Sequence, residues 1–350
     1  MIPKNVPKQS TLHDGISRRR FIQAGTAALA FGAGLKMGAD QKSKSPGTQG
    51  KPLRLGIISD VHHGLQPDAI KRLESFIQAM EAEKPDLIIQ LGDFCYARPE
   101  SREFVEVWEQ FKGPRYHVLG NHDMDRTTKQ ETMDFIGMRA PHYSFDAGDF
   151  HFVVLDCNYI LNDGEYVNYA NRNYFIEQAR RDRINPEQVE WLRADLAGTQ
   201  RQTFIFSHQA FDENWSGWSV PNRLEVRAVI REANQKAMDR TGAPHVIACF
   251  SGHHHIDEVS EIEGVQYMQM NSASYYWTGG KFGSEGPRAV YSKPLYALVT
   301  LDPSGQIGVK GQAGEFHKPT PADTGFPAAK RLTAAIIDRT IKFPTAGQKG

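Results

Sequence analysis

Cysteine is scarce in this chain. Only three of its 350 residues are cysteines, Cys95, Cys157 and Cys249. An odd number without CxxC spacing excludes a disulfide framework and a thiolate zinc knuckle. We expect free thiols buried among apolar neighbours, although an oxidising compartment would allow one pair to close. An excess of one charge is missing too, because 41 basic residues balance 41 acidic ones. With no overall basic field, a charged substrate must be attracted locally.

A long hydrophobic run is also lacking near the N-terminus. In "SRRRFIQAGTAALAFGAGLKMGAD" the basic residues at 18–20 precede an apolar run that is too brief to span a bilayer comfortably. The order Ser17, Arg18, Arg19, any residue, Phe21, Ile22 resembles the twin-arginine export signal. We therefore predict a signal segment at 1–39 and a location in the periplasm or on the outer face of the cell membrane. The alternative is an ordinary basic terminus.

The predicted cleavage site of this segment is poor, because Met37, Gly38 and Ala39 do not form a good small-x-small pattern. An uncleaved segment would be the protein's only contact with a membrane. Residues 40–52, "DQKSKSPGTQGKP", have the composition of a flexible linker.

From Leu53 onward, apolar bursts alternate with amphipathic stretches. "LRLGIISD", "DLIIQLGD" and "RYHVLGNHD" have strand patterns, and "PDAIKRLESFIQAMEAE" and "REFVEVWEQF" between them have helical patterns. A second alternating half includes "QTFIFSH" and "HVIACFSGHHH". This order predicts an α/β fold with mostly parallel strands. We place one domain at 53–311, with a surface excursion around 157–183. The tail at 312–350 contains a modest amphipathic pattern that predicts a peripheral helix.

Aspartate, asparagine and histidine residues, whose side chains can bind metals, follow five of the predicted strands. They are Asp60 and His62, then Asp93, then Asn121, His122 and Asp123, then His208, and finally His253 and His255. The carboxyl ends of strands in an open α/β sheet converge on one crevice, so these side chains should meet. In extended backbone, residues two apart project to the same side, so His253 and His255 could share a partner while His254 points away.

The motifs DxH, GDxx, GNHD, a lone His and GHxH, in this order, resemble those of the calcineurin-like metallophosphoesterase superfamily. The resemblance covers about 53–309 and implies a four-layer α/β/β/α sandwich holding two metal ions. It assigns Asp60, His62 and His255 to one metal, Asn121, His208 and His253 to the other, and Asp93 to both. Ligands without thiolates suit Mn, Fe, Zn or Co, as divalent or mixed-valence ions.

The resemblance implies hydrolysis of a small phosphomonoester or phosphodiester by a hydroxide that bridges the metals. The segments "FSHQ", "NRLEVRAVI" and "VIACFSGHHH" are also similar to those of a branch that hydrolyses nucleotide diphosphates such as ADP-ribose or CDP-alcohols. Two other interpretations are a nuclease, which the balanced charge disfavours, and a scaffold that has lost its metals. We expect no nucleic-acid partner.

In the family, the histidine of the GNHD motif faces the substrate, which makes His122 a catalytic residue that stabilises the transition state or protonates the leaving group. Asp123 would orient and charge the His122 ring, or else cap a helix. Tyr96 matches the position of an iron-binding tyrosine in purple acid phosphatases, but those enzymes lack the counterpart of His62. Tyr96 is therefore either a ligand or a packing residue.

Aromatic residues follow His208 and the triple histidine, where they could stack on an aromatic leaving group or pack in the core. They are Trp215, Trp218, Tyr275, Tyr276 and Trp277. Lys281 and Arg288 are candidate phosphate contacts.

Overall fold

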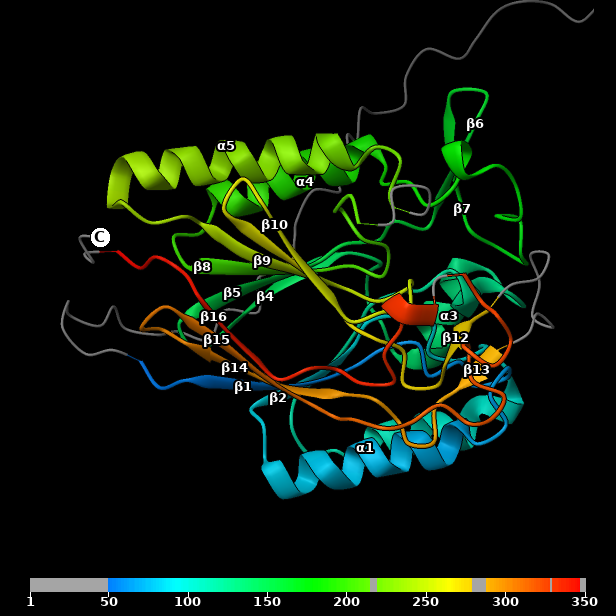
Figure 1. Ribbon diagram of the computed structural model, residues 1–350. Coiled ribbons are helices and arrows are strands. Elements are labelled where there is room, and N and C mark those ends of the chain that lie inside the picture. Colours follow the sequence, from blue (N-terminus) through cyan, green and yellow to red (C-terminus); the bar gives the residue numbers. More distant parts are fainter. Residues whose placement is uncertain (1–49, 215–218, 279–287, 328, 347–350) are drawn as a thin grey trace, which may run out of the picture. The chain divides into compact units, whose positions relative to one another are not determined.

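The structure, a computed structural model, describes residues 50–214, 219–278, 288–327 and 329–346. The predicted signal segment, most of the linker, Trp215, Trp218 and Lys281 lie outside the described residues. Two six-stranded sheets form the centre of the described fold (Figure 1).

The first sheet has the strand order β16-β15-β14-β1-β2-β3. Its strands are β16 (Arg339–Lys342), β15 (Gln306–Gly311), β14 (Ala297–Asp302), β1 (Leu53–Ile58), β2 (Leu87–Gln90) and β3 (Arg115–His117). β1, β2 and β3 run parallel, whereas β14, β15 and β16 extend the sheet in antiparallel fashion. The three parallel strands therefore end at one edge.

The second sheet has the order β10-β11-β9-β8-β5-β4. Its strands are β10 (Glu258–Ile262), β11 (Val265–Gln269), β9 (Val246–Ser251), β8 (Gln202–Phe206), β5 (Phe150–Val154) and β4 (Tyr143–Ala147). The four inner strands are parallel, and the two edge strands are antiparallel. Two small hairpins, β6 (Tyr159–Asn162) with β7 (Glu165–Asn168) and β12 (Tyr275–Trp277) with β13 (Arg288–Val290), lie outside the main sheets.

Helices cover the outer face of each sheet. They are α1 (Ala69–Glu83) and α2 (Arg102–Glu109) on the first sheet and α4 (Pro186–Ala197) and α5 (Arg223–Thr241) on the second. The remaining α-helix of the described residues, α3 (Lys129–Ile136), contacts the His122–Met124 turn. α1 lies below the first sheet and α4 and α5 lie above the second in Figure 1. Short 3₁₀ turns occupy Pro99–Ser101, His122–Met124, Gln178–Arg180 and Ala329–Arg331. The arrangement is the predicted α/β/β/α sandwich.

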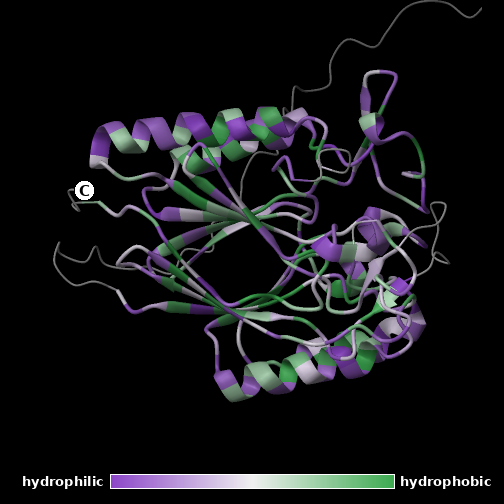
Figure 2. Ribbon diagram, viewed as in Figure 1, coloured by the Kyte–Doolittle hydropathy of each residue, from purple (hydrophilic) through white to green (hydrophobic). Residues whose placement is uncertain are grey.

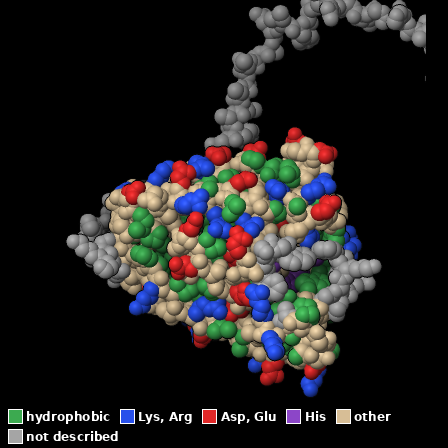
Figure 3. All heavy atoms as spheres, turned by 45° about the horizontal axis from the view of Figure 1, so that its top comes forward, with side chains coloured by type: hydrophobic (Ala, Val, Ile, Leu, Met, Phe, Trp, Pro, Cys, Tyr) green, Lys and Arg blue, Asp and Glu red, His purple; other side chains and the backbone are tan. Residues whose placement is uncertain are grey.

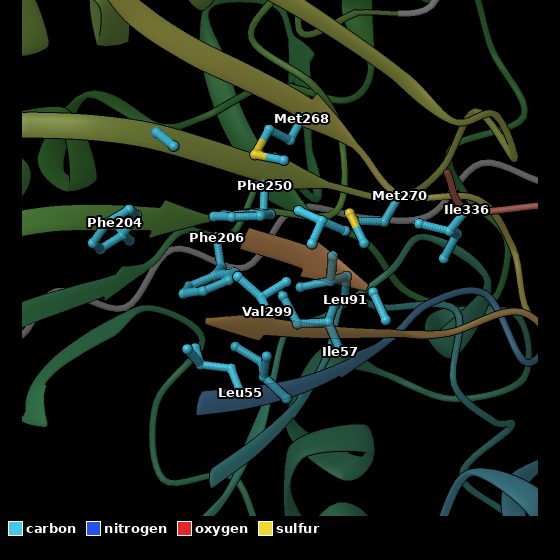
Figure 4. Close-up of a cluster of buried hydrophobic side chains, with 14 of the residues drawn as sticks. Leu55, Ile57, Leu91, Phe204, Phe206, Phe250, Met268, Met270, Val299 and Ile336 are labelled. Atoms are coloured by element: carbon cyan, nitrogen blue, oxygen red, sulfur yellow. The ribbon is translucent and has the colours of Figure 1, made fainter. Parts of the chain in front are cut away.

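The alternating direction of successive side chains along each strand produces these layers. Leu55 and Ile57 of β1 face the other sheet, whereas Ile58 packs against α1 and α2. Figure 4 shows Phe206 and Phe250 of the second sheet pointing toward the strands of the first, and apolar residues gather along the central strands in Figure 2. Because successive strand residues point to opposite faces, each strand supplies two apolar layers. Full burial of each large side chain stabilises the fold by about 1.5–3 kcal/mol.

The helix predicted in the C-terminal tail is wrong. Strand β16 pairs with β15, and Ile336 and Phe343 join the core between the sheets. The alternation of partly buried and exposed residues along β16 suits an edge strand, which the short helical pattern obscured. The excursion around 157–183 also contains the β6–β7 hairpin.

All three cysteines are buried free thiols, as predicted. Among the described residues, no helix combines the length and apolar character that a membrane span requires.

Candidate metal centre

The carboxyl ends of β1, β2, β8 and β9, together with the turn after β3, bring the predicted ligands into contact. One group of potential ligand atoms comes from Asp60, His62, Asp93 and His255. A second comes from Asp93, His208 and His253. Within each group the ligand atoms lie within 4.8 Å of one another. Asp93 belongs to both groups, which is the position that a bridging carboxylate requires.

The first group is centred on imidazole nitrogens. Nε2 of His255 lies 3.0 Å from Oδ1 of Asp60 and 3.1 Å from Nε2 of His62. His62 Nε2 is also 3.7 Å from Oδ2 of Asp93. All four side chains are buried.

The amide of Asn121 lies beside the second group. Nε2 of His208 lies 3.2 Å from Oδ2 of Asp93, 3.1 Å from Oδ1 of Asn121 and 3.2 Å from Nδ1 of His253. The other Asp93 oxygen, Oδ1, accepts a hydrogen bond of 2.8 Å from the backbone N–H of His122. One oxygen of Asp93 is therefore fixed by the backbone while the other faces both histidine groups.

Two of the histidines are oriented for metal binding by backbone carbonyls. Nδ1 of His208 donates to the carbonyl of Leu91 at 2.8 Å, and Nδ1 of His255 donates to that of Tyr275 at 2.5 Å. A carbonyl only accepts hydrogen bonds, so Nδ1 carries a proton in both rings, and Nε2 is the nitrogen that faces the site and can bind a metal once it holds no proton. This is the usual orientation of metal-binding histidines.

The charges of the site also fit cations. Burial lowers the pKa of His62 and His253 well below the usual range, so both rings are neutral and keep a lone pair. Burial would also lower the pKa of His208, but Asp93 and Asp60 outweigh it and raise that pKa to about 10. The two buried carboxylates thus favour a positive charge at this place. A donor set of carboxylate, imidazole and amide oxygen fits borderline divalent metals.

The backbone of the site is held in an uncommon conformation. Five of the predicted ligands have positive φ: Asp60 (53°), His62 (56°), Asp93 (50°), His253 (68°) and His255 (54°). The extended conformation expected around the triple histidine is therefore wrong, although His254 does turn to Gln269, outside the ligand groups. Such conformations cost of order 1–3 kcal/mol each and cluster at functional sites. Strand ends that turn sharply can aim nearby residues at different partners.

A glycine allows two of the motif segments to approach closely. A Cβ atom at Gly252 would lie 2.0 Å from Oγ of Ser59 and 2.5 Å from Oδ2 of Asp60. The same Asp60 oxygen accepts a hydrogen bond of 3.1 Å from the backbone N–H of His253. The glycine before the histidines is needed because a larger residue would displace a ligand carboxylate.

His122 borders the candidate ligands and is only partly buried. Its ring centroid lies 5.3 Å from that of His62, and its side chain is 17% exposed. Nδ1 of His122 lies 3.0 Å from Oδ2 of Asp125. Burial would lower the pKa of His122, but Asp93 and Asp125 outweigh it and raise that pKa.

The role predicted for Asp123 is wrong. Its Oδ1 accepts hydrogen bonds from the backbone N–H groups of Phe94 (2.7 Å) and Cys95 (3.1 Å), and Oδ2 accepts one of 2.8 Å from Gly120. Asp123 therefore ties the Asp93 loop to the turn after β3 and does not orient His122. Burial and the nearby Asp93 raise the pKa of Asp123 to about 7.

Sequence reasoning missed Asp125, which takes the role assigned to Asp123. The usable signal was its position three residues after His122, because one helical turn puts such residues side by side. Tyr96 donates to Asp125 Oδ2 at 3.2 Å, so the Tyr96 hydroxyl is engaged beside the candidate metal site. Cys95 is buried, and burial raises its pKa well above the usual range, which disfavours a thiolate nucleophile.

The aromatic residues after the triple histidine divide between core and site. The Tyr275 ring stacks on His62, with centroids 5.0 Å apart, and Tyr276 packs against Phe326 in the core. Trp277 lies beside His62 and His122, with centroids 6.4 Å apart in both pairs.

A sequence model of the calcineurin-like phosphoesterase family matches residues 53–257. The chain belongs to this family. With the cluster of potential ligands, the family identifies the chain as a metal-dependent phosphoester hydrolase. In this calcineurin-like phosphoesterase the two ligand groups lie at the carboxyl ends of strands from both sheets. Histidine side chains are visible in a recess of the face seen in Figure 3.

Solved structures share the fold at low sequence identity. A dimetal phosphatase from Danio rerio is 15% identical with a TM-score of 0.56, and the match covers 83% of this chain and 99% of that one. GAP50, described as the anchor in the inner membrane complex of Plasmodium, is 15% identical with a TM-score of 0.53 and coverages of 85% and 90%. A search among curated proteins gave no match.

Proposed function

We propose that this protein hydrolyses a small phosphate ester at a dinuclear metal centre. The observation that carries the proposal is the pair of ligand groups that share Asp93. We assign Asp60, His62 and His255 to one metal and Asn121, His208 and His253 to the other. Two bound metals would polarise the phosphoryl group and lower the pKa of a water molecule held between them. Mn, Fe, Zn and Co all suit these ligands.

The protein's own residues would supply the remaining steps. His122 lies at the exposed side of the site, with Nδ1 directed to Asp125. Its other nitrogen is then available to the substrate. In our proposal it stabilises the charge on the phosphoryl oxygens or gives a proton to the leaving oxygen. Such proton transfer typically contributes 10²–10⁴-fold to the rate.

The experiment is hydrolysis of 4-nitrophenyl phosphate, its bis ester and ADP-ribose by the full chain supplied with Mn²⁺, together with elemental analysis. We expect activity that chelation removes and metal restores. Asp93→Ala should lose both metals, whereas His122→Ala should retain them and lose most of its turnover. His317→Ala, at an exposed histidine, is the matched control. Full activity in Asp93→Ala, or in protein freed of metal, would refute the proposal.

A small substrate suits the charge distribution better than a polymer does. The chain has no net charge, and acidic and basic side chains are mixed over the face seen in Figure 3. Long nucleic acids require an extended basic surface. Retention of the protein on a DNA column that weakens with rising salt would contradict this part of the proposal.

We further propose that the protein is exported by the twin-arginine route, on the basis of Ser17, Arg18, Arg19, Phe21 and Ile22. Cell fractionation of the full chain and of an Arg18→Lys/Arg19→Lys variant tests it. The variant should stay in the cytoplasm, and equal export of both forms would refute the assignment.

A further inference from the structure

A side-chain pair on the small β12–β13 hairpin borders the candidate metal centre. Trp277 and Arg288 are partners across the two strands. The ring of Trp277 lies 6.4 Å from that of His122, with the planes 28° apart, and 6.4 Å from that of His62. Trp277 therefore lies beside both a candidate metal ligand and the candidate proton donor. It is only partly buried, so part of the ring remains open.

The guanidinium of Arg288 is held beside the same rings. Its central carbon lies 5.0 Å from the centroid of Tyr275 and 5.7 Å from that of Trp277. Nη1 of Arg288 donates a hydrogen bond of 2.7 Å to the carbonyl of Leu65. These contacts fix the position of the guanidinium without neutralising its charge.

No carboxylate among the described residues forms an ion pair with Arg288. Arginines elsewhere in the described chain do have such partners: Arg172 pairs with Asp125 and Arg339 with Asp257. A fixed, partly buried guanidinium that no described carboxylate pairs with has donors suited to an anion from solution. An open indole ring beside it offers a stacking surface.

We propose that Trp277 and Arg288 recognise the leaving group of the substrate, and that this group carries a flat aromatic ring and a second phosphate, as in a nucleoside diphosphate. This inference rests on the proposed phosphoester hydrolysis. Water adds to the terminal phosphorus, the bond from phosphorus to the bridging oxygen breaks, and that oxygen remains on the second phosphate. The water protons pass to the products and solvent. Arg288 binds the second phosphate while Trp277 stacks on the ring.

Four substrates separate the two features in a factorial test. ADP has both an aromatic ring and a second phosphate in its leaving group, 4-nitrophenyl phosphate has only the ring, inorganic diphosphate has only the second phosphate, and glycerol 2-phosphate has neither. The measured quantity is the ratio of kcat/KM between variant and wild type for each substrate. This ratio removes the intrinsic differences in reactivity.

Trp277→Ala should lower kcat/KM for ADP and 4-nitrophenyl phosphate about tenfold more than for the other two, the size expected for one stacked ring. Arg288→Gln should lower kcat/KM for ADP and diphosphate roughly 10- to 100-fold more than for the other two, as for a hydrogen bond to a charged group. Trp277→Phe and Arg288→Lys should recover part of the loss.

Binding of AMP, followed by calorimetry on the metal-loaded protein, gives a readout independent of turnover. Trp277→Ala and Arg288→Gln should both weaken AMP binding and leave binding of inorganic phosphate less affected. Arg240→Gln is the control. Arg240 is exposed at the end of α5, just before β9 begins, whereas the site lies at the carboxyl end of β9. Elemental analysis and thermal unfolding check the metals and the fold.

Equal losses on all four substrates, with unaltered preference for AMP over phosphate, would overturn the inference and leave the proposed hydrolysis in place. If the metal-loaded wild type hydrolyses none of the four, the proposed hydrolysis fails and this inference fails with it. Recovery by Trp277→Phe on the two aromatic substrates alone would support it, even if Trp277→Ala folds poorly.

Discussion

Oδ2 of Asp125 lies 3.0 Å from Nδ1 of His122, one turn further along the chain. Tyr96 and Tyr174 both donate hydrogen bonds to the same carboxylate, which is buried. Nε of Arg172 approaches it at 3.3 Å. Asp125 is therefore fixed by several neighbours and in turn fixes the ring of His122, which makes it a positioning residue.

Asp125→Asn should reduce kcat roughly 10- to 100-fold, the usual effect of losing a partner that orients a site histidine. The loss should be larger for alkyl than for 4-nitrophenyl phosphates, because a poor leaving group depends more on protonation. Metal content should stay unaltered, as measured by elemental analysis. Asp134→Asn, at an exposed aspartate of α3, is the control. The double variant with His122→Ala should be no slower than His122→Ala alone, and additive losses would contradict the positioning role.

Gly252→Ala should impair the metal centre, because the new Cβ would collide with Ser59 and Asp60. We expect weaker metal binding and a stability loss of about 1–3 kcal/mol, typical of overpacking. Metal titration and denaturant unfolding measure the two effects. Gly308→Ala is the matched control, since the nearest atom to its Cβ would be 3.9 Å away. An unaltered metal affinity in Gly252→Ala would contradict the close packing.

A histidine remote from the ligand set should make stability depend on pH. His151 lies 2.7 Å from Asp146 through Nδ1 and 2.8 Å from Asp195 through Nε2. Burial would lower the pKa of His151, but the hydrogen bonds to Asp195 and Asp146 outweigh it and raise that pKa. The other charged or titratable groups nearby are Arg201, 3.6 Å from Asp146, and His245, whose pKa burial lowers to about 4.

Because the folded form binds the His151 proton more tightly, its stabilisation is complete below the pKa of an unfolded histidine, about 6.5. It is lost as the pH rises through the raised pKa of the folded state. His151→Gln should therefore be less stable than wild type by about 1–2 kcal/mol at low pH, with a smaller difference at high pH. Urea unfolding at a series of pH values measures this, and a pH-independent difference would contradict it.

The C-terminal strand should contribute to the stability of the domain. Phe343 is 7% exposed and lies 6.3 Å from Phe204, centroid to centroid, so Phe343→Ala should cost about 3 kcal/mol. Ile337→Ala should change stability by less than about 0.5 kcal/mol, because Ile337 is 49% exposed. Chemical denaturation compares the two variants, and equal effects would show that the strand does not pack as described.

Local sequence patterns were sufficient to predict much of the candidate metal centre. Each motif residue follows an apolar strand pattern, and parallel strands of one sheet end at a common edge, so chain direction predicts that Asp60 and Asp93 lie together. His208 follows a strand of the second sheet and meets them only because the two sheets pack together. The layered fold follows from the alternation of strands and helices. The prediction for the tail failed because four residues of an edge strand carry too little periodicity to distinguish it from a helix.

The amino-acid sequence alone determined the order of the layers and which residue types meet at the strand ends, since both follow from short-range periodicity and chain direction. Only the tertiary structure decided that Asp125 and not Asp123 meets His122, and that Trp277 and Arg288 border the centre. Which of two neighbouring carboxylates faces a ring depends on the direction of each side chain, and this is set by hydrogen bonds from segments distant in sequence.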